Sequence, residues 1–281
     1  MELSLGITFA VLGAALLHAS WNALIKAGRD PQLDTALVAL SGTVVALPLA
    51  LAVEPPAPSS WPFIGATVTV HIGYYVALAA AYRQGDLSHA YPIMRGVAPL
   101  IVALASALWI GETLSPKTWA AVLCICGGVL SLAFAGRRAG RDTRATTLWA
   151  LGCAAIIAVY TLIDAAGVRV SGGADRYVIW LFVFLGLPFG LYVLATRRAA
   201  LLRHARTHWW RGVVGAVFSG LSYGIALWAM TRAPVAIVAA LRETSVIFAA
   251  LIGAWLLKEG HLRARLAGAA AVLAGLITLK L

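Results

Sequence analysis

Residues 90–99 read AYPIMRGVAP and lie inside an apolar run that extends from Leu87 to Ile110. A run of this length can cross a bilayer, because the hydrocarbon core takes a helix of roughly 20 residues. It nevertheless contains Arg95, and a charge at that depth costs about 2.5–3.5 kcal/mol unless a partner, water or a ligand compensates it. Prolines and glycine also open or loosen a helix. We therefore predict a cavity-lining segment with hinge residues Pro92, Gly96 and Pro99.

A structural role is the alternative for this segment. In that case the helix is only kinked, and Arg95 pairs with a carboxylate or with free backbone carbonyl groups for packing.

A second copy of the pattern lies 147 positions further along the chain. At this offset Arg95 falls on Arg242 and Glu112 falls on Glu259. Charges are rare in this sequence, so these matches are more informative than the glycine and alanine matches that accompany them. We predict two repeats, residues 1–138 and 145–281. Repeats of this kind are common in membrane transporters. The alternative is that the duplication produced a stable helical bundle that does not transport anything.

The composition is that of an integral membrane protein. The chain has 281 residues, of which 61% are hydrophobic and 12% are charged, and its mean hydropathy is +0.87. We predict an all-α fold with ten transmembrane helices, arranged as two inverted five-helix repeats around a central cavity. The predicted spans are Ser4–Lys26, Asp34–Val53, Trp61–Arg83, Leu87–Ile110, Pro116–Ala135, Thr146–Val170, Asp175–Thr196, Trp209–Thr231, Val235–Leu257 and Leu262–Leu281. The longest predicted connections are Gly136–Ala145 and Arg197–His208.

The basic residues are unevenly distributed among the connections. Of the 22 Lys and Arg residues, 15 lie in the connections after the odd-numbered spans and five lie on the opposite side. The positive-inside rule then predicts a multi-pass protein of the inner (plasma) membrane with both termini outside. Membrane topology accounts for the net charge of +11, so no nucleic-acid partner is predicted.

Several segments resemble a known family. They are HASWNALIK at 18–26, GDLSHAYPIMRGVAPLIVAL at 85–104, GETLS at 111–115 and ALRETSVIFAALIGAWLLKE at 240–259. They resemble the EamA-type branch of the drug/metabolite transporter superfamily, and the resemblance covers essentially the whole chain. It implies a basket of ten helices, with helices 1, 3, 4, 6, 8 and 9 around the cavity. Within the superfamily the chain is similar to the YddG-type aromatic amino acid exporters.

Polar and aromatic side chains in the predicted cavity helices form the candidate substrate site. A guanidinium group binds a carboxylate, an acidic side chain binds an ammonium group, and aromatic rings hold an apolar side chain. The candidates are His18, Trp21, His71, Tyr75, Tyr82, Tyr91, Arg95, Tyr160, Asp164, Tyr223, Arg242, Glu243 and Ser245. Core packing is the alternative for each histidine and aromatic residue, and a structural ion pair with Arg242 is the alternative for Asp164.

The segment RETS at 242–245 leaves one question open. Four consecutive polar residues cover every side of a helix, since each turns by about 100°. Either Arg242 or Glu243 faces the cavity while the other faces a neighbouring helix, or the helix is locally unwound.

We predict a secondary transporter that exports small organic solutes, most of all amino acids with aromatic or apolar side chains. The alternative is broad efflux of drugs, cations or other metabolites. No enzyme, cofactor or metal site is predicted, because no nucleotide-binding, hydrolase or metalloprotease motif occurs and the histidines are isolated. Coupling to protons is left open, and the short connections are compatible with a monomer.

Overall fold

The computed structural model describes residues 4–84, 87–135, 144–255, 270, 273–275 and 277–278. The regular elements within these ranges are all helical. The helices are α1 (Leu5–Lys26), α2 (Pro31–Ala52), α3 (Trp61–Gln84), α4 (Leu87–Ala105), α5 (Pro116–Ala135), α6 (Arg144–Arg169), α7 (Ala174–Leu185), α8 (Leu187–Met230), α9 (Val235–Arg242) and α10 (Ser245–Trp255). A 3₁₀ turn at Pro58–Ser60 precedes α3, and a π-helical turn at Ser106–Ile110 follows α4.

The first two helices begin at side-chain caps. The hydroxyl of Ser4 accepts a hydrogen bond from the backbone of Ile7, and the carboxylate of Asp30 accepts one from the backbone of Leu33. These bonds satisfy amide groups that have no partner within the first helical turn. Pro31 occupies the first turn of α2, where a missing N–H group has no cost.

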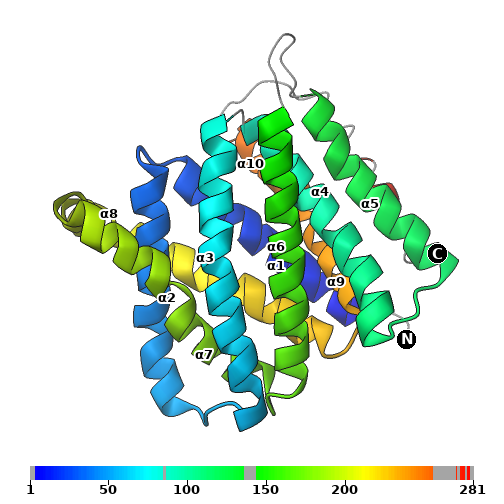
Figure 1. Ribbon diagram of the computed structural model, residues 1–281, viewed down its shortest axis with the longest axis horizontal. Coiled ribbons are helices and arrows are strands. Elements are labelled where there is room, and N and C mark those ends of the chain that lie inside the picture. The colour runs from blue at the N-terminus through cyan, green and yellow to red at the C-terminus, as the bar shows by residue number, and fades with distance from the viewer. Residues whose placement is uncertain are drawn as a thin grey trace.

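The helices form a bundle in which segments from distant parts of the sequence alternate. Helix α3 packs against α6, and α4 packs against both α5 and α6. Helices α1 and α2 pack against α8, which also contacts α7. In Figure 1, α3 and α6 stand side by side, with α1 and the C-terminal part of α8 crossing behind them. The interior of the bundle is therefore built from both halves of the chain.

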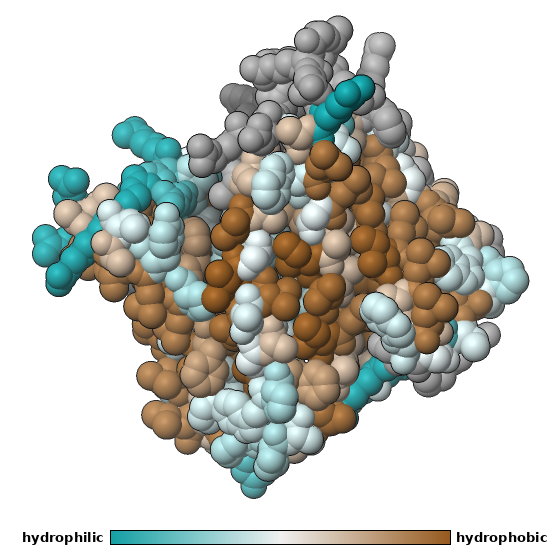
Figure 2. Space-filling model, in the orientation of Figure 1, coloured by the Kyte–Doolittle hydropathy of each residue, from teal (hydrophilic) through white to brown (hydrophobic). Residues whose placement is uncertain are grey.

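The surface of the bundle is suited to lipid. Large side chains are widely exposed, among them Phe9 at 69%, Leu51 at 81% and Trp109 at 80%. Figure 2 shows apolar residues over much of the visible face, with hydrophilic residues gathered at its edges. In water an apolar surface of this extent is unfavourable, whereas a bilayer solvates it.

Six helical stretches are long and apolar enough to cross a membrane, counted over the described residues. They are Leu5–Lys26, Pro31–Ala52, His89–Trp109, Pro116–Ala133, Arg144–Arg169 and Ala174–Met230. The prediction of a helical membrane protein is confirmed at this level, while the ten-helix arrangement of two inverted repeats stays a prediction. The predicted last span, Leu262–Leu281, lies largely outside the described residues.

The backbone of helix α4 is more regular than the sequence predicts. The sequence predicts an opening around Arg95, but α4 is continuous through Pro92 and Pro99, and the irregular backbone lies beyond it in the π-helical turn. Both prolines are buried, and packing on α5, α6 and α9 supports the helix on several sides. A side chain at Gly96 would meet Leu130 of α5 at 2.6 Å, so the glycine allows a close approach of the two helices.

The predicted connection Arg197–His208 is itself helical. It forms part of the long helix α8, with non-helical backbone only at Arg197 and His208. Leu201 within it is 2% exposed and belongs to an apolar cluster with Leu33 and Val193. This segment has no long apolar run, but the burial of Leu201 and the good helix formers around it stabilise the helix. The other long connection, Gly136–Ala145, lies mostly outside the described residues.

Candidate functional site

A buried ion pair lies in the interior, between α4 and the break that follows α9. Nε of Arg95 is 2.9 Å from Oε2 of Glu243, and the two side chains are 9% and 5% exposed. The N–H group is not directed at the oxygen well enough for a hydrogen bond, and Nη2 of Arg95 has no hydrogen-bond partner among the described residues. The pair thus offsets two buried charges but leaves hydrogen-bonding capacity unused.

The α-helical hydrogen-bond pattern is interrupted at Glu243 and Thr244. The backbone amides of Glu243 and Thr244 bond to carbonyl groups three residues earlier, at 3.0 and 3.1 Å, rather than four. Helix α9 ends at Arg242 and α10 begins at Ser245, with Glu243 and Thr244 between them. The helix is therefore interrupted within RETS, but by a tighter 3₁₀-type turn rather than by unwinding. The break lets Glu243 point toward α4 and Arg242 point elsewhere.

Arg242 lies near α8. Its guanidinium carbon is 5.1 Å from the ring centre of Tyr223, a cation–π contact. The side chain is half-buried. The hydroxyl of Tyr223 in turn donates a short hydrogen bond to Asp164 of α6. Arg242 and Asp164 are therefore linked through Tyr223, and no direct ion pair joins them among the described residues.

Asp164 is a meeting point of four helices. It is fully buried, and its carboxylate accepts hydrogen bonds from the hydroxyls of Thr67 at 2.6 Å, Tyr177 at 2.8 Å and Tyr223. Those donors belong to α3, α7 and α8. Three hydroxyl donors replace much of the hydration that the carboxylate loses on burial. This geometry favours a role in holding helices together.

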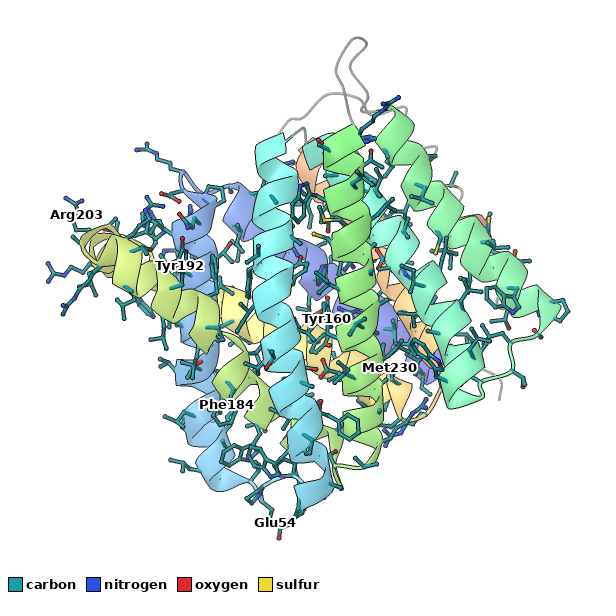
Figure 3. The ribbon with its side chains drawn as sticks, viewed as in Figure 1. Glu54, Tyr160, Phe184, Tyr192, Arg203 and Met230 are labelled. Carbon is teal, nitrogen blue, oxygen red and sulfur yellow. The ribbon has the colours of Figure 1, made fainter. Side chains whose placement is uncertain are left out.

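Aromatic side chains of α3 and α6 form a group beside the charged residues. The rings of His71 and Tyr160 are 4.3 Å apart, and Tyr74 contacts both of them edge-on at 6.0 and 6.2 Å. Nδ1 of His71 is 2.9 Å from the carbonyl oxygen of Thr67. In Figure 3, Tyr160 lies well inside the bundle, far from Glu54 and Arg203 at its extremities.

Three further candidates contact this region or lie close to it. His18 and Trp21 of α1 contact each other edge-on at 5.4 Å, and the buried Nε1 of Trp21 has no hydrogen-bond partner among the described residues. The same is true of the buried hydroxyl of Ser245, at the start of α10. Helix α1 packs against both α9 and α10. Unused polar groups therefore come from α1, α4 and α10.

The remaining predicted site residues are more scattered. Tyr75 stacks on Phe189 of α8 at 4.5 Å, so it faces a different neighbour from His71. Tyr91 is half-buried on α4, one helical turn before Arg95. The side chain of Tyr82 lies outside the part of the chain that the structure describes.

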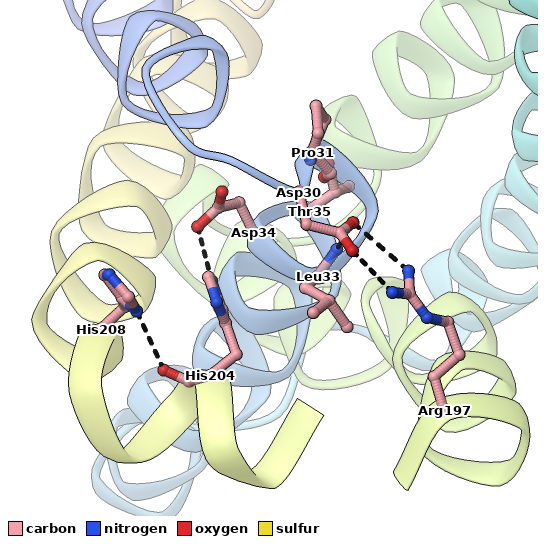
Figure 4. A network of polar contacts seen from close by, with 8 residues as sticks. All are labelled: Asp30, Pro31, Leu33, Asp34, Thr35, Arg197, His204 and His208. Atoms are coloured by element: carbon pink, nitrogen blue, oxygen red, sulfur yellow. Dashed lines mark hydrogen bonds and ion pairs between the residues drawn. The ribbon is translucent and has the colours of Figure 1, made fainter. Parts of the chain in front are cut away.

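Polar contacts also join the two halves of the chain at opposite ends of the bundle. At one end Glu112 accepts from Arg169 at 2.7 Å and from the backbone of Val235 at 2.9 Å. At the other end Arg197 donates to Asp30 at 2.6 Å, and His204 lies 2.8 Å from Asp34 (Figure 4). The Arg197 guanidinium holds the pKa of Asp30 below its ordinary value.

Sequence reasoning missed two partners of Asp164. Thr67 and Tyr177 were not predicted as site residues, although Thr67 lies one turn before His71 on the same side of α3. Their single hydroxyl groups are inconspicuous in apolar runs. His89 was also missed: it is 5% exposed, and its Nε2 lies 2.9 Å from the hydroxyl of Thr147.

The fold and the interior together define a class of protein. The interior of this helical membrane protein contains a buried ion pair, polar groups without hydrogen-bond partners among the described residues, and aromatic rings. These features are typical of a membrane transporter for small molecules. No three His, Cys, Asp or Glu side chains come together as a metal site within the residues described.

The comparisons with known proteins identify the family. The model of the EamA-like transporter family matches residues 4–134 and again residues 144–281. The chain therefore belongs to this family of the drug/metabolite transporter superfamily, whose members are membrane transporters and not enzymes. A solved crystal structure is similar in fold, with a TM-score of 0.72 and 20% sequence identity over 98% of this chain and 98% of that one. The narrower likeness to YddG-type exporters stays a prediction.

Proposed function

We propose that this transporter exports amino acids with aromatic or apolar side chains across the inner membrane. The observation that carries the proposal is the Arg95–Glu243 pair, because its groups are buried and charged yet keep unused hydrogen-bonding capacity. Charged side chains buried within membrane-spanning segments are rare and commonly mark a substrate pathway.

The unused groups match the ends of a zwitterion. The free Nη2 of Arg95 is a donor for a substrate carboxylate, and Oε2 of Glu243 and the hydroxyl of Ser245 are acceptors for an ammonium group. A substrate that inserts between Arg95 and Glu243 would replace one ion pair with two. The free energy of substrate binding would then offset the cost of separating Arg95 from Glu243.

The aromatic group supplies a place for the substrate side chain. His71, Tyr74 and Tyr160 contact one another and present ring faces and polar edges together. Such surfaces hold aromatic and apolar groups by offset stacking and edge contacts. Asp164 has a supporting role in this proposal, since its three hydroxyl bonds hold Tyr223 beneath Arg242.

Movement is proposed to follow alternating access between two inverted repeats, residues 1–138 and 145–281. The break between α9 and α10 lies beside the ion pair and is one point at which the chain can bend. The hinge residues of α4 are proposed to be Pro92, Gly96 and Pro99. The pair itself joins the two repeats, so a substrate that separates it also loosens their contact.

Broad efflux of drugs or organic cations is the second candidate. The buried carboxylates of Asp164 and Glu243 favour it, because a cation needs an anionic partner in the membrane. Both carboxylates are already engaged, however, Glu243 by Arg95 and Asp164 by three hydroxyls. An arginine with a free donor favours a substrate that carries an anionic group.

Uptake into liposomes tests this proposal. The purified chain is reconstituted, and labelled tryptophan, phenylalanine, alanine and a quaternary ammonium ion are supplied with and without a pH gradient. We expect saturable movement of tryptophan and phenylalanine. Movement of the quaternary ion alone would support the second candidate, and movement of none of the four would remove the amino acid proposal.

A further inference from the structure

A strongly basic helical segment leaves the bundle sideways within α8. Residues 197–211 contain five arginines and no acidic residue. The backbone departs from helical angles at Arg197, with φ −134° and ψ 34°, and again at His208, with φ −120° and ψ 17°. Between these points α8 projects beyond the neighbouring helices at the left of Figure 1. We refer to residues 197–211 as the basic arm.

The basic arm is held against the N-terminus of α2. Arg197 donates to both carboxylate oxygens of Asp30, at 2.6 and 3.3 Å, and to the side chain of Gln32 at 2.8 Å. His204 lies 2.8 Å from Asp34, as Figure 4 shows. These contacts engage both oxygens of Asp30 and one oxygen of Asp34, and they hold the arm against α2.

The outer side of the arm is cationic. Arg198, Arg203 and Arg206 are exposed, and none of them has an ion pair or hydrogen bond to another described residue. Figure 2 shows this projecting end as a hydrophilic patch beside the apolar flank of the bundle. Three unneutralised guanidinium groups on a segment with no acid of its own require an anionic partner or free solvent.

Apolar side chains border the same patch. Trp209 and Trp210 are 62% and 45% exposed, and Leu202 is 47% exposed. The guanidinium carbon of Arg211 is 5.5 Å from the ring centre of Trp210. Arginine, tryptophan and leucine side by side are characteristic of a helix that lies at the boundary between lipid headgroups and acyl chains.

We propose that the basic arm binds the headgroups of anionic phospholipids at the membrane surface, with Arg198, Arg203 and Arg206 as phosphate ligands and the two tryptophans in the interfacial layer. Exposed apolar side chains such as Leu191 lie on α8 just before the arm, so the headgroups of a bilayer that covers them would be within reach of the arm. Guanidinium groups bind phosphate through paired donors, and the surface of an anionic membrane attracts each basic residue further. A nucleic acid would not account for the exposed Leu202. This site is separate from the proposed substrate site. A failure of lipid binding would therefore not affect the proposed transport function, and the reverse also holds.

Binding of a fluorescent lipid to the full chain in neutral detergent micelles tests the proposal. Dansyl-labelled phosphatidylglycerol is titrated, and energy transfer from tryptophan is recorded, with dansyl-labelled phosphatidylcholine as the zwitterionic comparison. The variant Arg198→Gln/Arg203→Gln/Arg206→Gln is expected to bind phosphatidylglycerol roughly tenfold or more weakly than the unaltered chain. A matched variant, Lys117→Gln/Arg176→Gln/Arg232→Gln, removes three charges elsewhere and should bind normally.

Two further measurements keep the proposal testable if the glutamine variant folds poorly. Replacing the same three arginines with lysine should keep most of the binding, because the charges remain. Added salt should weaken binding of phosphatidylglycerol to the unaltered chain. Unchanged affinity in the glutamine variant, equal affinity for the two lipids, or insensitivity to salt would each overturn the proposal.

Discussion

Arg95 of α4 and Glu243 after α9 meet in the interior, with Nε and Oε2 2.9 Å apart. Arg95 belongs to the first segment that the family model matches and Glu243 to the second. Arg242, which falls on Arg95 at an offset of 147 residues, has a different neighbour, because it lies over the ring of Tyr223. Two matching arginines thus have unequal environments: among the described residues, Arg95 forms a direct ion pair with a buried acid and Arg242 does not.

Breaking this pair from one side should be costly. In Glu243→Gln the guanidinium of Arg95 stays buried without its counter-charge, and we expect the free energy of unfolding to fall by roughly 3–5 kcal/mol. Thermal unfolding in detergent measures the loss. The double variant Arg95→Met/Glu243→Gln removes both charges and should recover part of it. A double variant as unstable as the sum of Arg95→Met and Glu243→Gln, each measured alone, would contradict coupling between the residues.

Asp164 should be more important for stability than for substrate contact. Asp164→Asn replaces an acceptor oxygen with a donor group, so at least one of the three hydroxyls loses its partner, at about 1–3 kcal/mol. Tyr177→Phe removes one of the same bonds from the other side and is expected to lower stability by about 1 kcal/mol while transport continues. For both variants, chemical denaturation measures the stability and uptake into liposomes measures the transport, on the same preparations. Loss of transport in Tyr177→Phe at unchanged stability would contradict the supporting role.

Glu112 should stabilise the start of α9. Its carboxylate accepts from the backbone of Val235 and from Arg169, so Glu112→Ala removes a helix cap and an ion pair together. We expect a loss of about 1–2 kcal/mol. Glu54→Ala is the matched control, since Glu54 is 76% exposed and pairs with Arg176 at the surface. The control should change stability by less than about 0.5 kcal/mol; equal losses in both variants would show that Glu112 does not cap the helix.

The Asp30–Arg197 pair predicts a dependence on pH. Arg197 lowers the pKa of Asp30, so the stabilisation is present above the ordinary carboxyl pKa of about 3.9 and is lost as the pH falls below it. The difference in melting temperature between the unaltered chain and Arg197→Gln should be constant from about pH 6 to pH 8 and should shrink below about pH 4. A difference that persists unchanged at the acidic end would show that Arg197 stabilises the fold without Asp30.

Much of the helical organisation was predictable because long apolar runs decide it. The first six predicted spans correspond to α1 to α6 within a few residues, with the end of the fourth forming the π-helical turn. The region after residue 186 was less predictable. The sequence predicts only a connection at Arg197–His208, and contacts of Leu201, Arg197 and His204 with α2 support its helical form. Such tertiary contacts leave no periodic signal in the sequence.

The site was predictable in its charges but not in its pairing. Rare charges in apolar runs mark Arg95, Asp164 and Glu243, since burial of a charge demands compensation. Which partner compensates each one depends on how distant helices meet. Asp164 was expected to pair with Arg242 or to bind a ligand. Among the described residues it accepts hydrogen bonds from Thr67, Tyr177 and Tyr223 and forms no ion pair with Arg242, while the ligand role stays a prediction. Hydroxyl groups are too common for their positions alone to reveal such a site.

Uptake of labelled tryptophan by Arg95→Lys tests most directly whether Arg95 binds the carboxylate of the substrate. Lysine keeps the positive charge opposite Glu243 but lacks the planar fork of donors that binds a carboxylate. Lys117→Gln, an exposed change at the start of α5, is the control. We expect Arg95→Lys to raise KM for tryptophan by roughly tenfold or more, and Lys117→Gln to leave it unchanged. Uptake by Arg95→Lys with the KM and rate of the unaltered chain would contradict a role for Arg95 in binding the substrate.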